Sequence, residues 1–363
     1  MSIQDFDTER LINIGYDSCT ASCGKFMVLD HTILDKSSNI SGLHVMPLSE
    51  ACKAYPHVRD ELFFKIVDKD KNENTQLAAR SPVVGYYVLV DEGVKIEEPL
   101  QAAFLFGTDG DVQVIHNIIE LKEGAELNIV NGCTTAHNCG AGRHIGVTET
   151  YLGKDSSLGY TMLHNWGSTM EVFPVGATVV GEGAKYISNY VAMTSVKNIV
   201  SCPVAYVKEH GSARFYSIIY AREPSFFDTG AKVVLEGDGA SGEIISRVVS
   251  EGGTVISRQM LSGDVKGTLG HMECSGLLLN DRGVIHSIPE LRGAHPDINL
   301  SHEAALGKIS DEELSYLMTR GLTEEQARSL IIRGFLDLRI EGLPKKVQML
   351  VDEIIDRSLG GTI

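Results

Sequence analysis

A repeat of small-residue pairs, each at the start of a strand-like segment, constrains the fold of this 363-residue chain more than any other feature. The pairs follow one another at spacings of 32, 27, 28 and 28 residues. A unit of this length cannot bury its own apolar face, whereas stacked units share one continuous core. The repeat therefore predicts a β-solenoid, and a β-sandwich with evenly spaced turns is the alternative. The pairs are Gly124-Ala125, Ser156-Ser157, Gly183-Ala184, Gly211-Ser212 and Gly239-Ala240.

Three regions of the chain differ in their sequence pattern. Alternating apolar and polar residues, punctuated by glycine-containing turns, run from 83 to 295, and this alternation is typical of strands. Residues 1–82 mix short helix-compatible and irregular segments. Residues 296–363 contain two capping-box patterns, one starting at Ser310 and one at Thr323, and each predicts a helix start. We expect an N-terminal α and irregular cap (1–82), a β core (83–295) and a C-terminal helical domain (296–363).

Charge and hydropathy exclude several classes of partner. The chain has 32 Lys and Arg against 48 Asp and Glu, a formal net charge of -16, which opposes binding to nucleic acid or to an anionic membrane. No segment approaches the roughly 20 apolar residues of a membrane span, and the N-terminus lacks the pattern of a targeting peptide. We therefore expect a cytoplasmic protein. Seven scattered cysteines favour reduced thiols, some of them metal ligands, over a disulfide framework.

Three residues in the last third of the chain are candidate ligands. Cys274 lies in a strand-like segment, and its thiolate is a soft ligand suited to iron-sulfur clusters. His302 and Glu303 are adjacent where the strand region gives way to the helical region, and a carboxylate is a harder ligand that releases iron more easily. The structural alternatives are a buried packing thiol for Cys274 and, for the His302-Glu303 pair, polar side chains that form local hydrogen bonds at a helix start.

A second group of candidate ligands consists of Cys133, His137, Cys139 and His144. Two thiols and two imidazoles can complete a tetrahedral metal site if a strand and a turn bring them together, although their spacing matches no standard zinc pattern. The chain has no P-loop, nucleophile-elbow or zinc-protease motif, so any energy from nucleotide hydrolysis must come from a partner.

The segments around these candidates resemble a known family. In order, they are Cys274-Ser-Gly-Leu-Leu-Leu-Asn, Ile288-Pro-Glu-Leu, and the run from Asp297-Ile-Asn-Leu-Ser-His-Glu to Leu322. This set resembles the C-terminal half of the SufB/SufD family of iron-sulfur cluster assembly proteins, and similarity extends over most of residues 45–360. The resemblance implies a mainly β fold, namely a right-handed parallel β-helix core flanked by N-terminal and C-terminal helical regions. It also implies an ABC-type ATPase, the energy source of the SUF system, bound at the C-terminal helices.

The same resemblance implies a role for each candidate ligand. The cluster-building cysteine and glutamate of the SufB branch match Cys274 and Glu303, and the histidine of the SufD branch matches His302. Because one chain carries all three residues, we expect a homodimer of the minimal two-component kind found in anaerobic microbes, particularly archaea. We expect the two copies to pair through the late coils around 265–279. The other implied partners are a sulfur donor and apo-protein recipients.

These inferences lead to one preferred function and two alternatives. We expect a scaffold that assembles and transfers iron-sulfur clusters, 4Fe-4S in preference to 2Fe-2S, without catalytic turnover of its own. The alternatives are a cluster-free structural or regulatory subunit that docks the ATPase, and a β-helix enzyme that uses Glu and His as acid and base. For the cysteine that receives sulfur, Cys202 is one candidate and Cys133 or Cys139 are others. The sequence has no legible flavin-binding signature.

Overall fold

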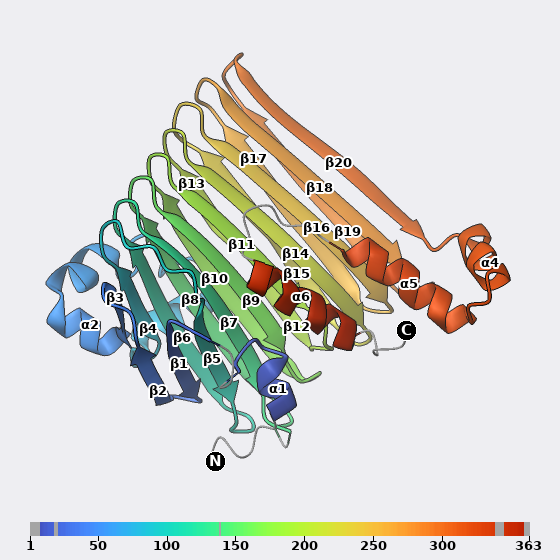
Figure 1. Ribbon diagram of the computed structural model, residues 1–363, viewed down its shortest axis with the longest axis horizontal. Helices are drawn as coiled ribbons and strands as arrows, with labels where there is room; N and C mark the ends of the chain where they lie inside the picture. Colours follow the sequence, from blue (N-terminus) through green and yellow to red (C-terminus); the bar gives the residue numbers. More distant parts are fainter. Residues whose placement is uncertain (1–7, 18–20, 138, 338–344, 359–363) are drawn as a thin grey trace.

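Two long β-sheets face each other and form one elongated solenoid (Figure 1). The computed structural model describes residues 8–17, 21–137, 139–337 and 345–358. From residue 86 on, the chain alternates between the two sheets, so that neighbouring strands of a sheet belong to successive coils. Strand pairs are parallel except β1 (Gly24–Leu29) with β2 (Thr32–Ser38) and β3 (Leu43–Pro47) with β4 (Tyr86–Val90). This architecture confirms the predicted parallel β-solenoid.

Each sheet contains ten strands. Sheet A has the order β2 (Thr32–Ser38), β1 (Gly24–Leu29), β5 (Leu100–Phe106), β7 (Glu126–Thr135), β9 (Ser157–Asn165), β11 (Lys185–Ala192), β14 (Ser212–Arg222), β16 (Ser241–Glu251), β18 (Thr268–Leu278) and β20 (Ile298–Lys308). Sheet B has the order β19 (Val284–Gly293), β17 (Thr254–Gly263), β15 (Phe226–Leu235), β12 (Asn198–Ser201), β10 (Met170–Val180), β8 (Gly142–Leu152), β6 (Val112–Leu121), β4 (Tyr86–Val90) and β3 (Leu43–Pro47), with β13 (Val204–Val207) pairing to β10 and β15.

The sequence repeat arises from one turn residue in each coil that adopts a left-handed backbone conformation. Gly124, Gly183 and Gly239 have φ of 66°, 65° and 63°, and Asp155 and His210 occupy the equivalent turns with φ of 54°. The N–H groups of these residues donate to a carbonyl of the next coil; that of Gly124, for example, bonds Lys154 at 2.8 Å. Glycine is favoured because a Cβ atom strains this conformation. The spacing of the turns is therefore the length of a coil.

The space between the sheets is the hydrophobic core. Successive side chains of a strand point to opposite faces, so every second residue enters this space. The core also encloses a cavity of about 120 Å³, and no charged side chain lines it. Among the largest fully buried side chains are Phe26, Tyr86, Phe104, Phe106 and Phe227.

The two ends of the solenoid differ. At the N-terminal end, the short antiparallel strands β2 and β3 close the sheets, and the region 1–82 thus contains strands as well as the predicted helices. The helical elements there are α1 (Thr8–Ile12), α2 (Leu48–Ala54), a π-helical turn (Val58–Leu62) and α3 (Glu73–Arg80). At the C-terminal end, β19 and β20 each pair with only one strand among the described residues. Most side chains of these two strands are exposed.

Three helices follow the last strand: α4 (Asp311–Thr319), α5 (Glu324–Leu336) and α6 (Lys345–Ser358). Thr323 forms the predicted capping box, since its hydroxyl accepts from Gln326 N–H at 3.2 Å. Ser310 precedes α4 but makes no capping bond. Figure 1 shows α5 and α6 lying across sheet A, where Leu336 and Val351 are buried in an apolar cluster with residues of the sheet.

The strands extend beyond the predicted end of the β core at 295. Residues 298–308 form β20, and helix begins only at Asp311. Among the helices that the structure describes, none combines the length and apolar character that a membrane span requires.

Candidate functional site

The candidate ligands Cys274, His302 and Glu303 lie on the adjacent strands β18 and β20. His302 and Glu303 are in the middle of β20, and not at a helix start as their sequence position had indicated. The strands pair in register, with Cys274 opposite Ala304 and Glu303 opposite Glu273. The predicted site residues are therefore on neighbouring coils at the C-terminal end of the solenoid.

Strand alternation separates these three side chains between the two faces of sheet A. A Cβ atom added at Gly276 would lie 3.0 Å from Ile285 of the opposite sheet, so the even-numbered residues of β18 face the interior. The register extends this assignment to β20. Cys274 and His302 consequently face the interior, whereas Glu303 faces outward. The structure brings the thiol and the imidazole to one face and places the carboxylate on the other.

Cys274 is completely buried and forms no disulfide. Its register neighbours are Ser246 on β16 and Ala304 on β20. Within one chain, the thiol therefore packs in the interior, as the structural alternative proposed. Because only one further strand covers it, the thiol is one coil away from the open end of the solenoid.

His302 carries an unsatisfied polar atom. Its Nε2 is shielded from solvent and has no hydrogen-bond partner among the described residues. The same is true of the hydroxyl of Ser287 on β19, which faces the interior because β19 pairs in register with β17. Burying an unpaired polar atom costs about 1–3 kcal/mol. Binding of a ligand to such an atom removes this cost and is therefore favoured. His302 is thus chemically available for a ligand.

Glu303 and its neighbour Glu273 have different surroundings on the outer face. Arg247 of β16 donates to Oε1 of Glu273, and the Ser275 hydroxyl donates to the same oxygen at 3.1 Å. Partial burial raises the pKa of Glu273, but the bonds from Arg247 and Ser275 outweigh it, so this pKa lies below its usual value. Glu303 is exposed and bonds to none of the described side chains. Its carboxylate is free to accept a ligand.

The second predicted ligand group does not form a single site. Cys133 and His144 are buried, whereas His137 is exposed and receives a bond from Arg10 at 3.3 Å. The half-buried thiol of Cys139 lies 3.8 Å from the carbonyl of Ala141. In the described ranges, no group of three or more His, Cys, Asp or Glu residues can hold a metal ion. The predicted tetrahedral arrangement is therefore absent from this part of the chain.

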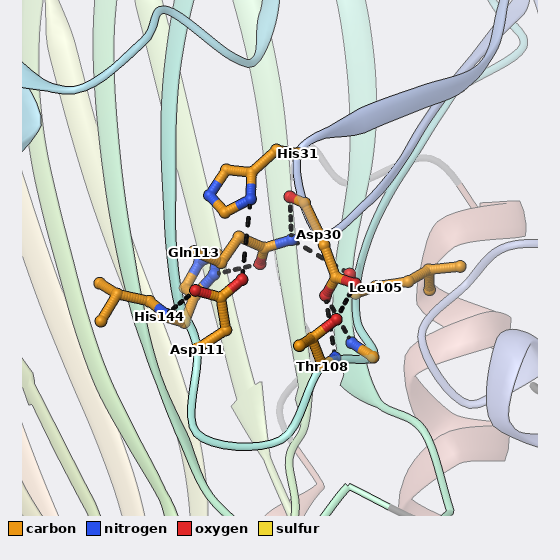
Figure 2. A network of polar contacts seen from close by, with 9 residues as sticks. Asp30, His31, Leu105, Thr108, Asp111, Gln113 and His144 are labelled. Carbon is orange, nitrogen blue, oxygen red and sulfur yellow. Dashed lines mark hydrogen bonds and ion pairs between the residues drawn. The ribbon is translucent and has the colours of Figure 1, made fainter. Parts of the chain in front are cut away.

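Two histidines instead line the cavity in their neutral form. Burial lowers the pKa of His144 and of His164 to about 3. Nδ1 of His144 lies 2.7 Å from Oε1 of Gln113, whose amide nitrogen donates to two backbone carbonyls (Figure 2). Since that amide fixes Oε1 as an acceptor, Nδ1 must donate and Nε2 retains its lone pair.

The sequence analysis missed His164, which pairs in register with Cys133 on the next strand. Its Nδ1 lies 3.1 Å from the Tyr190 hydroxyl. The separation of 31 residues between Cys133 and His164 is one coil, so aligning the repeats could have found the pair.

The thiols considered as sulfur acceptors are all less acidic than usual. Burial raises the pKa of Cys133, Cys139 and Cys202, that of Cys139 to about 11. Each is therefore a protonated thiol at neutral pH. Cys202 lies between β12 and β13, with its sulfur 4.0 Å from the carbonyl of Arg258.

Comparison with known proteins gives consistent matches. The family model described as "SUF system FeS cluster assembly, SufBD core domain" matches residues 104–335. An iron-sulfur cluster assembly SufBD family protein of Archaeoglobus fulgidus is 41% identical over 351 residues, covering 96% of this chain and 94% of the relative. A protein of the same description from Methanothermobacter thermautotrophicus is 38% identical over 359 residues, covering 97% of this chain and 88% of the relative. One from Pyrococcus horikoshii is 31% identical over 321 residues, covering 88% and 72%.

Proposed function

Since this chain belongs to the SufBD family of iron-sulfur cluster assembly proteins, we propose that it is the scaffold on which a nascent cluster is built and from which it is transferred. The cluster is cargo, so the protein needs no catalytic turnover of its own. The observation that carries the proposal is the position of Cys274 and His302 on one face at the open end of the solenoid, with Nε2 of His302 unpartnered. A soft thiolate and an imidazole are both suitable iron ligands.

A second copy of the chain would complete the site. β19 and β20 present unpaired backbone N–H and C=O groups along one edge of each sheet, and a two-fold partner can bond to them by continuing the sheets. Exposed apolar side chains on these strands, Val284, Leu291 and Leu306, would be buried by such a partner. Glu303 on the edge strand would then lie at the seam together with ligands of the other copy.

This seam is one coil later than the sequence had indicated. Residues 265–279 include β18, which is already hydrogen-bonded to β16 on one side and to β20 on the other. An added strand therefore has no free edge there. We place the homodimer contact at β19 and β20.

The energy source in this proposal is an ABC-type ATPase bound at the C-terminal helices. The sequence has no P-loop of its own, and the side chains of Tyr316 and Met318 on α4 are exposed at 58% and 45%. Exposed aromatic and methionine side chains are favourable anchors for a partner protein. A cytoplasmic sulfur donor and apo-protein recipients complete the proposed system, with 4Fe-4S as the favoured cargo.

An observation supports the cluster-free alternative, whereas the acid-base enzyme has no such support. Full burial of Cys274 favours a cluster-free subunit that only docks the ATPase. Acid-base catalysis by His302 and Glu303 is not supported, because these side chains project from opposite faces of the sheet.

Anaerobic reconstitution with iron and sulfide tests the scaffold proposal. The parent should retain a stoichiometric cluster after gel filtration, and Cys274→Ser should lose it, because a hydroxyl replaces a soft thiolate at nearly constant volume. Cys52→Ser is the control, because this free cysteine has no proposed role in the site, and it should behave like the parent. A parent that stays colourless would support the cluster-free alternative, and equal iron and sulfide in Cys274→Ser would remove Cys274 from the site.

A further inference from the structure

Two chemically identical carboxylates lie side by side on the outer face of sheet A. Glu273 on β18 and Glu303 on β20 are direct register partners, so their side chains project from the same face on neighbouring strands. Among the described side chains, Arg247 and Ser275 bond to Glu273, and none bonds to Glu303. The two glutamates therefore differ in their availability to a ligand because their neighbours differ, and not because of their own chemistry.

Arg247 is held firmly in place. Its side chain is 18% exposed, and it forms an ion pair with Glu273, which is 25% exposed. Its guanidinium carbon also lies 6.0 Å from the ring centroid of Phe335 on α5, within range of a cation-π contact. A partly buried charge-assisted bond is stronger and less screened than an exposed one. Arg247 is thus fixed between the sheet and the helix.

An arginine in this position changes which carboxylate can bind iron. A metal ion that approached Glu273 would have to displace the guanidinium and would be repelled by its positive charge. Glu303 has no such bond to lose. We propose that Arg247 is a specificity-determining residue, which occupies Glu273 and so leaves Glu303 as the carboxylate that binds iron of the nascent cluster. The inference rests on the proposed scaffold function. Arg247 acts through Glu273 and is a positioning residue.

A rescue experiment tests this role. After anaerobic reconstitution with iron and sulfide, the measured quantity is the rate at which a chelator removes iron from the full chain. Glu303→Gln should lose iron about tenfold faster than the parent. Adding Arg247→Met should restore the rate to within about threefold of the parent, because the freed Glu273 replaces Glu303 as a ligand. The methionine keeps an apolar stem against Phe335, which preserves the packing of α5.

Two controls distinguish the selection of Glu303 by Arg247 from a general disturbance of the fold. Arg247→Lys combined with Glu303→Gln should stay as labile as Glu303→Gln alone, because lysine retains the ion pair. Glu273→Gln in the parent should leave the rate unchanged, and in the Arg247→Met/Glu303→Gln background it should abolish the rescue. Thermal unfolding of each apo variant reports whether the fold is kept.

The outcomes distinguish this inference from the proposed function. If Glu303→Gln holds iron like the parent, the carboxylate is not a ligand and the proposed site itself fails. If Glu303→Gln is labile and a folded Arg247→Met/Glu303→Gln is equally labile, selection by Arg247 is overturned. Should the methionine variant not fold, Glu273→Gln decides alone: iron loss as fast as in Glu303→Gln would show that Glu273 is already a ligand and would refute the inference.

Discussion

Cys274 and Glu303 project from opposite faces of one sheet, although they lie on adjacent strands that pair in register. A single iron atom bound to both within one chain would have to bridge the sheet. However, β20 is the edge strand of sheet A, so no further strand of the described chain lies beside Glu303. A shared site is therefore possible only around this edge, where a second chain would also bind.

The imidazole of His302 should lower the stability of the apo protein and prolong the lifetime of the bound cluster. Replacing it by leucine removes an unpaired buried nitrogen, so His302→Leu should stabilise the apo protein by about 1 kcal/mol while shortening the lifetime of the bound cluster. Denaturant unfolding of the apo protein and iron retention measure the two effects. Loss of stability together with unchanged iron retention would mean that the imidazole serves packing alone.

The open end should determine the oligomeric state. Leu306→Lys places a charge in the proposed seam and should convert a dimer into a monomer, because a lysine on an edge strand disfavours strand addition. Leu269→Lys is a matched control, since Leu269 is also exposed but lies on the internal strand β18. Native mass spectrometry counts the copies. A dimer that survives Leu306→Lys, or dissociates equally in both variants, would contradict a seam at β19 and β20.

The turn glycines should contribute stability through their backbone conformation. At Gly124 a Cβ atom has room, the nearest atom being 3.7 Å away, so Gly124→Ala tests conformation alone and should destabilise the protein by about 1 kcal/mol. Gly307 lies in open space without positive φ, and Gly307→Ala should change stability by less than about 0.5 kcal/mol. Urea unfolding compares them. If both substitutions changed the free energy of unfolding equally, the left-handed turn would not be the reason for glycine in the repeat.

Helix α4 should carry the contact to the ATPase. Tyr316→Glu combined with Met318→Glu should greatly reduce copurification of the ATPase, because charges replace the proposed apolar anchors. Point changes are preferable to deletion of the helices, since α5 and α6 cover an apolar face of sheet A. Leu34→Glu at the other end of the solenoid is the control, with similar exposure at 38%. Undiminished binding by the α4 variant would move the docking surface elsewhere.

The fold was predictable from sequence because left-handed turns favour glycine and recur once per coil. The coils with Asp155 or His210 at this position did not hide the repeat, since the small residues Ser156 and Gly211 follow them. β20 was missed for the opposite reason. From Glu303 to Lys308 both faces of this edge strand are exposed, so apolar and polar residues need not alternate there, and this half of β20 lacked a strand signal.

The sequence predicted that Cys274 lies on a strand, but it did not predict that His302 and Glu303 also lie on one, nor which face of the sheet each candidate residue occupies. The spacing of Cys274 and Glu303 along the chain places them one coil apart only if the coil length is known to the residue. A shift of one residue in register would have turned Glu303 inward. The same uncertainty concealed the pairing of Cys133 with His164, whose coil of 31 residues is longer than the later ones.

The difference between the two ends of the solenoid also limits polymerisation. At the N-terminal end the sheets finish in short antiparallel strands, β2 with the charged residues Asp35 and Lys36 and β3 ending at Pro47, and such features block the addition of further strands. A solenoid that could accept strands at both ends would grow into a fibre. If only the C-terminal end accepts a partner, as proposed, growth would stop once two molecules have paired.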